Sequence, residues 1–183
     1  MASWFEPVAP EDYVYSVQDM VDIAKTSVQA INGAFQPTVD VSAPDALHIS
    51  AAALPVLIDI MFVAFGNAAK WSGTEGPLSM RVEVTHDEAK GVLRIRVENE
   101  VASGVITSLA RKKIAEKKVE VAGQTYDRAR SEGGSGLIKV ASIIYQSTLG
   151  KLDFGFLGES RFFFEADLAF LSNRSSKDED PAR

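Results

Sequence analysis

The chain has 183 residues, of which 46% are hydrophobic and 24% charged, and its formal net charge is −6. This length and composition predict one folded domain with a buried core, and the acidic balance argues against nucleic acid or an anionic membrane as partner. The absence of cysteine excludes disulfides and cysteine-bound zinc. The first residues have no basic start and no long apolar run, so no secretory signal is predicted and a cytoplasmic location fits best.

The N-terminal third predicts one helix and short extended segments. Apolar residues recur every three or four positions over 11–35, which predicts a helix with one apolar face. Gly33 and Pro37 mark its end. Residues 38–50 alternate loosely and predict either two short strands or a strand and a turn.

Residues 52–71 form the clearest helical pattern of the chain. Asp59, Asn67 and Lys70 interrupt its apolar run, so it is predicted to be a core helix and not a membrane span.

Residues 79–86 and 91–99 both alternate and predict a β-hairpin. A basic helix over 103–117, capped by Ser103, and a mobile loop over 118–133 are predicted to follow. The alternating series of the hairpin are Met80, Val82 and Val84 on the first strand and Val92, Ile95 and Val97 on the second, with Leu93 slightly out of step.

The remaining sequence predicts a helix over 134–149, ended by Gly150, and two strands over 151–157 and 161–170. The last residues, 172–183, are polar and predicted to be disordered. Strands separated by helices without strict βαβ alternation predict an α+β fold, a two-layer α/β sandwich whose mixed β-sheet is covered on one face by helices.

Two asparagines stand at positions suited to ligand binding. Asn67 lies in an apolar helix, where a buried amide without a partner is costly. Asn99 ends a strand, and its amide oxygen can accept a hydrogen bond from an exocyclic amine. Taken singly, each also fits a structural role, Asn67 as a helix-end residue bonded to a loop and Asn99 in an Asx turn.

A glycine-rich turn precedes the last predicted helix. Its backbone N–H groups, together with the helix N-terminus, can cradle a phosphate. The P-loop pattern is absent, and a flexible hinge with a helix cap is the structural alternative. The residues of this turn are Gly133, Gly134, Ser135, Gly136 and Leu137.

In order and spacing these features resemble the GHKL superfamily, which includes histidine kinases, DNA gyrase, heat-shock chaperones and mismatch-repair ATPases. Residues 57–71 resemble the N-box helix of histidine kinases, commonly Asn-Ala-x-Lys-Tyr at its end. Residues 95–99 resemble the strand into the first glycine box, and 134–140 resemble the second, Gly-x-Gly-Leu-x-x-Val. Residues 150–154 and 161–164 resemble the final hairpin.

The resemblance implies the Bergerat, or histidine kinase-like ATPase, fold with ATP and Mg²⁺ as ligands. The ATP-binding domain would span 37–171, with a lid over about 101–133, and 1–36 would be a packing or dimerisation helix. In this resemblance Asn67 holds Mg²⁺, Lys70 contacts phosphate, Trp71 lies against the nucleotide, and Asn99 replaces the family Asp that accepts from the adenine amine. Gly133, Gly134, Ser135, Gly136 and Leu137 would cradle phosphates, and Arg128 and Arg130 in the lid would contact them.

The sequence departs from the family pattern at two places. After Asn99 the first glycine box has lost its glycines except for Gly104, and Glu100 near the phosphates would be unfavourable unless a metal intervenes. Hydrolytic members carry a glutamate base one helical turn before the N-box asparagine, where this chain has Val63. Valine cannot take a proton, so hydrolysis by that route is not expected.

Three functions remain open from the sequence. The first is a nucleotide-responsive signalling or regulatory module that passes its state to a protein partner or a neighbouring domain. The second is an ATP-dependent kinase acting on a separate chain, or a weak ATPase, because the predicted first helix carries no phosphoacceptor histidine. The third is a degenerate pseudo-ATPase that serves as an interaction scaffold or forms a homodimer.

Overall fold

The computed structural model describes residues 13–74, 76–123 and 136–170. Its elements are β1 (Val14–Tyr15), α1 (Val17–Ile31), β2 (Pro37–Ser42), β3 (Ile49–Ser50), α2 (Leu54–Trp71), β4 (Leu78–Asp87), β5 (Val92–Glu100), α3 (Ser108–Ala122), α4 (Gly136–Ile144), β6 (Lys151–Leu157) and β7 (Arg161–Ala169).

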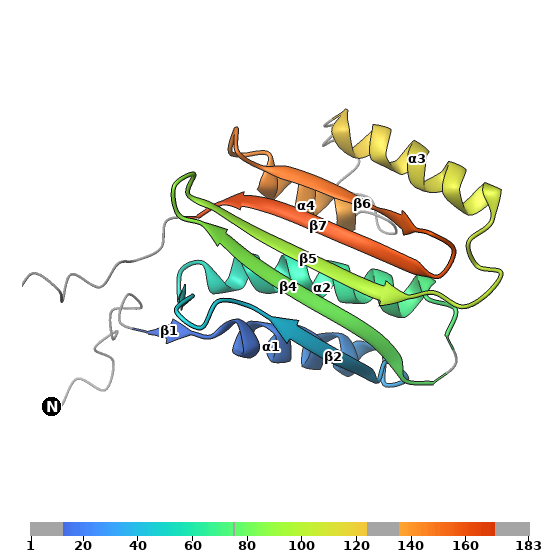
Figure 1. The fold of residues 1–183 in the computed structure, drawn as a ribbon, viewed down its shortest axis with the longest axis horizontal. Helices are drawn as coiled ribbons and strands as arrows, with labels where there is room; N and C mark the ends of the chain where they lie inside the picture. The colour runs from blue at the N-terminus through green and yellow to red at the C-terminus, as the bar shows by residue number, and fades with distance from the viewer. Residues whose placement is uncertain (1–12, 75, 124–135, 171–183) are drawn as a thin grey trace, which may run out of the picture.

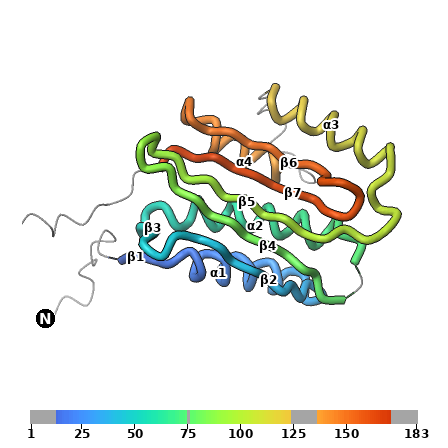
Figure 2. The backbone as a smooth tube through the Cα atoms, in the orientation of Figure 1, coloured from blue at the N-terminus to red at the C-terminus, as the bar shows by residue number. Residues whose placement is uncertain are grey.

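A five-stranded mixed sheet forms one layer of the molecule, with strand order β2-β4-β5-β7-β6. β2 is parallel to β4, and all other neighbours are antiparallel. Figure 1 shows α1, α2 and α4 behind one face of this sheet and α3 beside the edge strand β6, and Figure 2 shows the same arrangement as a tube. The predicted two-layer α+β sandwich is therefore confirmed.

The core lies between α2, α1 and the covered face of the sheet. α1 begins at a capping box, in which the Ser16 side chain accepts from the Asp19 N–H and the Asp19 carboxylate accepts from the Ser16 N–H. Burying a large apolar side chain contributes about 1.5–3 kcal/mol, so these two helices are held mainly by their apolar faces. The most deeply buried side chains on them are Met20, Val21, Ala24, Leu57, Ile60, Met61 and Phe65.

By length and apolar composition α2 is the one helix in the described part of the chain that could cross a membrane. In this fold its apolar side packs against α1 and the sheet, as predicted for a core helix.

The hairpin of β4 and β5 was predicted correctly except for the phase of its second strand. Met80, Val82 and Val84 are buried on β4, but on β5 the buried series is Leu93, Ile95 and Val97, so Leu93 takes the place that the predicted series gave to Val92. The register explains the difference, because Leu93 stands opposite His86, which continues the inward series of β4. Asn99 is in phase with Leu93 and therefore lies on the helix-covered face.

α3 begins later and ends later than predicted. Thr107 is its N-cap, accepting from the Ala110 N–H at 3.1 Å, so the predicted cap Ser103 and the start at 103 are wrong. Gly104 adopts a left-handed turn at φ +85° in the segment before it. Residues 118–122, predicted as loop, are helical, and 124–133 lie outside the described residues.

The C-terminal elements follow the predicted order. α4 ends at Ile144, five residues before the predicted end, and a turn leads to Gly150. A Cβ at Gly150 would stand only 1.9 Å from the Ile144 carbonyl oxygen, which explains why glycine is needed there. β6 and β7 match the two predicted strands, and the polar tail 172–183 lies outside the described residues.

Candidate nucleotide site

A cavity of about 450 Å³ opens at one end of the molecule, between the end of α2, the end of β5, α3 and the start of α4. It has the size of a small-molecule site. Its lining residues are Asn67, Lys70, Trp71, Asn99, Val105, Thr107, Leu109, Ala110, Lys113, Ile114, Lys117, Gly136, Leu137, Phe156 and Phe162.

The last turns of α2 contribute Asn67, Lys70 and Trp71 to this cavity. Asn67 is half-buried, and among the described residues no side chain or backbone group bonds to its amide. Trp71 is 60% exposed, and the Lys70 Nζ lies 4.9 Å from its ring centroid. Helical spacing of three and four places the amide and the ammonium on one side of the helix. An amide oxygen and an ammonium are thus free to meet a ligand.

Asn99 lines the cavity from the sheet and is only 4% exposed. Its Nδ2 donates to the Glu100 carbonyl at 2.7 Å, which leaves Oδ1 as an acceptor. The backbone beyond it is held in place, because the Val101 N–H donates to the Ser160 carbonyl and the Ala102 N–H to the Ser72 carbonyl. The altered first glycine box is therefore an ordered turn.

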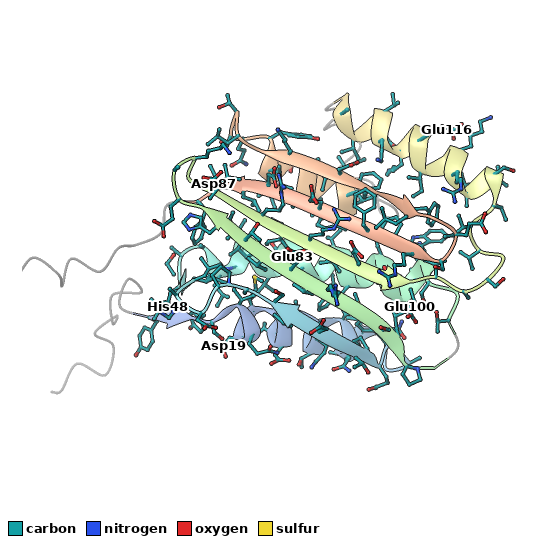
Figure 3. All side chains as sticks on the ribbon, viewed as in Figure 1. Asp19, His48, Glu83, Asp87, Glu100 and Glu116 are labelled. Atoms are coloured by element: carbon teal, nitrogen blue, oxygen red, sulfur yellow. The ribbon has the colours of Figure 1, made fainter. Side chains whose placement is uncertain are left out.

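Glu100 does not lie in this cavity. It points to the opposite, uncovered face of the sheet and lines a separate polar cavity of about 150 Å³. Figure 3 shows it at the same end of the sheet where β5 ends. The strand alternation that buries Asn99 turns Glu100 to this other face, so its carboxylate is outside the lining of the larger cavity.

The start of α4 contributes Gly136 and Leu137. A Cβ at Gly136 would lie 3.3 Å from Val63 Cγ1, so the glycine lets the helix approach α2 closely at the position where hydrolytic relatives have glutamate. Gly133, Gly134 and Ser135, with Arg128 and Arg130, lie outside the described residues. Of the predicted site residues, the structure brings Asn67, Lys70, Trp71, Asn99, Gly136 and Leu137 to one cavity.

Sequence reasoning missed the contribution of α3. Lys113 and Lys117, spaced by four, both line the cavity. With Lys70 they make three lysines in the lining, and among the described lining residues there is no Asp or Glu. The basic character of this helix was visible in the sequence, but only packing shows which lysines face inward.

The final hairpin supplies aromatic walls that sequence reasoning also did not assign to the site. Phe156 of β6 and Phe162 of β7 stand opposite each other, with ring centroids 5.6 Å apart and nearly perpendicular. With Trp71, Ile114 and Leu137 they form the main apolar part of the cavity lining. A flat apolar group joined to an anion fits this combination.

Comparison with known proteins gives the same fold. Residues 16–171 match the family described as "y4jQ C-terminal putative histidine kinase domain". No curated protein matches the sequence. The nucleotide-free catalytic domain of histidine kinase ThkA has a TM-score of 0.58 at 13% identity, covering 86% of this chain and 95% of that one.

Two further structures are similar. The mycobacterial sensor histidine kinase MprB has a TM-score of 0.52 at 17% identity over 85% of this chain and 97% of that one. Histidine kinase AdeS of Acinetobacter baumannii has a TM-score of 0.53 at 11% identity over 87% of this chain and 68% of that one. Identities this low show the fold alone. Since the family match spans well over half of its residues, the chain belongs to this histidine-kinase-like family and has a GHKL-like fold.

Proposed function

We propose that this domain binds ATP with Mg²⁺ in the cavity between α2, α3 and α4 and acts as a nucleotide-responsive signalling or regulatory module. The observation that carries the proposal is the cavity lining, which combines three lysines, three aromatic side chains and two amides. Lysine is a common phosphate ligand, and aromatic walls suit a purine ring.

Each predicted residue has a distinct part in this proposal. Asn99 Oδ1 would accept from the adenine amine, since Nδ2 is already bonded to the Glu100 carbonyl. Lys70 would contact the phosphates, and backbone N–H groups at the start of α4 would add to this anion site. A protein partner or neighbouring domain would then read the state of α3, which lines the cavity.

The donor set fits Mg²⁺ bound mainly by the nucleotide. Asn67 offers one amide oxygen, and Mg²⁺ in phosphate sites usually takes few protein ligands and keeps several waters. Among the described residues no group of three or more His, Cys, Asp or Glu could hold a metal by itself. Asn67 would therefore orient an ion that the phosphates bring, as the family resemblance implies.

Calorimetry with ATP, ADP and Mg²⁺ tests the proposal. Trp71 gives a second signal, because the chain has only two tryptophans and Trp4→Phe leaves Trp71 as the sole emitter at the cavity. We expect saturable binding with a fluorescence change, and a Kd at least about tenfold weaker in Lys70→Ala, since a lost bond to a charged group costs about 1.5–3 kcal/mol. No binding at millimolar nucleotide would refute the proposal.

A second candidate is phosphoryl transfer to a separate chain. His48 and His86 lie away from the cavity, His48 beside β3 at the other end of the molecule from Glu100 (Figure 3) and His86 near the β4–β5 turn. Val63 packs where a hydrolytic base would stand, which favours transfer over hydrolysis. Radiolabelled ATP with candidate acceptor proteins tests this. Transfer that Asn67→Ala leaves unchanged would exclude this cavity as its source.

A third candidate is a scaffold without nucleotide function. It is favoured by the loss of the family carboxylate at Asn99 and of the base at Val63. A thermal shift absent with every nucleotide, together with a stable oligomer in solution, is its expected signature.

A further inference from the structure

α3 carries basic residues on two of its sides, and they have different surroundings. Arg111 donates through Nη2 to the Gly158 carbonyl of the β6–β7 turn, and Lys118 pairs with the Asp153 carboxylate of β6. Lys113 and Lys117 line the cavity instead. The helix is thus held to the edge of the sheet by one basic pair while the other pair faces the cavity.

Together with Lys70, these two residues make three lysines in the lining of the cavity where the polyphosphate would lie. Lys117 also pairs with Glu120 at 3.0 Å, but Glu120 is not part of the lining. Lysine is a compact point charge on a flexible stem and can follow a phosphate group that moves.

Free ATP carries about four negative charges at neutral pH, and in most sites a divalent cation neutralises a large share of them. Three ammonium groups in a partly enclosed space can neutralise a similar share. In this cavity the described lining holds no carboxylate that would repel an uncomplexed phosphate.

We propose that Lys70, Lys113 and Lys117 let the cavity bind ATP as the metal-free anion nearly as tightly as its Mg²⁺ complex. The inference rests on the proposed nucleotide site and adds the ionic form of the ligand. Mg²⁺ would then adjust phosphate geometry through Asn67 and contribute little to affinity. Lys113 and Lys117 are binding residues in this inference, and Lys112 is a bystander that lies 73% exposed near Glu116.

The experiment measures the Kd of ATP by calorimetry at fixed ionic strength, once with excess Mg²⁺ and once with EDTA. The double variant Lys113→Met and Lys117→Met removes both charges but keeps apolar stems that can pack. The matched control, Lys112→Met and Lys139→Met, makes the same change in net charge at two exposed positions outside the lining. Circular dichroism and urea midpoints establish that all three proteins are folded.

For the parent protein we expect the Kd in EDTA to lie within about fivefold of the Kd in Mg²⁺. We expect the same ratio of the two Kd values in the control variant. In the cavity variant we expect this ratio to exceed about fivefold, because Mg²⁺ then has to replace two ammonium groups. Parent binding that weakens more than fivefold in EDTA would overturn the inference and leave the proposed function intact. An unchanged ratio in the cavity variant would overturn the assignment of the two lysines. No binding in either buffer would overturn both proposals.

Discussion

The turn after α2 depends on Gly73, and replacing it should test how the cavity wall is built. Gly73 has φ +62°, a left-handed conformation, and a Cβ built there would lie 2.5 Å from Val105 Cγ2. Val105 lines the cavity, and Trp71 two residues before Gly73 lines it too. Gly73→Ala should therefore disturb the contact between the end of α2 and the segment leading to α3.

Two costs add in this variant. An L-residue in the left-handed region costs about 1–2 kcal/mol. Forcing a methyl group into an occupied space costs about 1–3 kcal/mol. The alanine also reduces the conformational entropy of the unfolded chain, which offsets these costs by about 0.4–1 kcal/mol. The expected loss in the free energy of unfolding is therefore about 1–4.5 kcal/mol.

Urea unfolding followed by circular dichroism measures this loss, and a thermal scan should show a fall in Tm of about 2–4 °C per kcal/mol for a chain of this size. Gly104→Ala is the matched control, because Gly104 also has positive φ, at +85°, but a Cβ there would meet nothing within 4 Å. Gly104→Ala should lower the free energy of unfolding by about 1 kcal/mol, because only the strained backbone conformation contributes.

The double variant Gly73→Ala with Val105→Ala isolates the clash. Removing the Val105 methyl groups should recover at least about 1 kcal/mol of coupling energy in a double-mutant cycle. If Gly73→Ala costs no more than Gly104→Ala, or the cycle shows no coupling, the close approach of Gly73 to Val105 is refuted.

Three further predictions concern groups outside the cavity. Arg94 donates to both oxygens of the nearly buried Asp167, at 2.7 and 2.8 Å, and this bond raises the pKa of Arg94. Arg94→Ala should lower the free energy of unfolding in urea by about 1–3 kcal/mol. Arg81→Ala, which breaks the exposed pair with Asp40, should lower it by at most about 1 kcal/mol. Equal losses in the two variants would contradict the stabilising role of the Arg94–Asp167 pair. Hydrogen bonds from the N-cap serine hold the pKa of Asp19 below its usual value, so its contribution to stability is present above pH 3.8 and is lost as the pH falls through the lower folded pKa. In Asp19→Asn, the urea midpoint should fall less steeply as the pH is lowered below 3.8 than it does in the parent protein. The same fall in both proteins would argue against the capping box. Lys118→Ala should speed hydrogen exchange of the α3 amides but not of the α2 amides, because it removes the ion pair that joins α3 to β6. An equal change in the exchange rates of both helices would contradict that role.

Several elements could be predicted because their signals are local. The alternation of Met80, Val82 and Val84 and the helical spacing over 52–71 depend only on residues next to one another in the chain. Asn67 and Asn99 could be selected because a polar residue in an apolar pattern is visible without a structure.

Other features depend on what packs against a segment. Val92 and Leu93 are both apolar, and only the register with His86 shows which of them faces the core. Ser103 and Thr107 are both good caps, and the turn at Gly104, with the bonds that tie Val101 and Ala102 to neighbouring segments, places the start of α3 at the second.

The sequence by itself determined the order of the elements, the class of fold and the asparagines on α2 and β5, since hydrophobic periodicity and residue chemistry are properties of short stretches of chain. Only the tertiary structure decided that Lys113 and Lys117 line one cavity with Asn67 while Glu100 lines another. The physical reason is that the direction of a side chain into a shared space follows from strand register and helix rotation, which long-range packing sets.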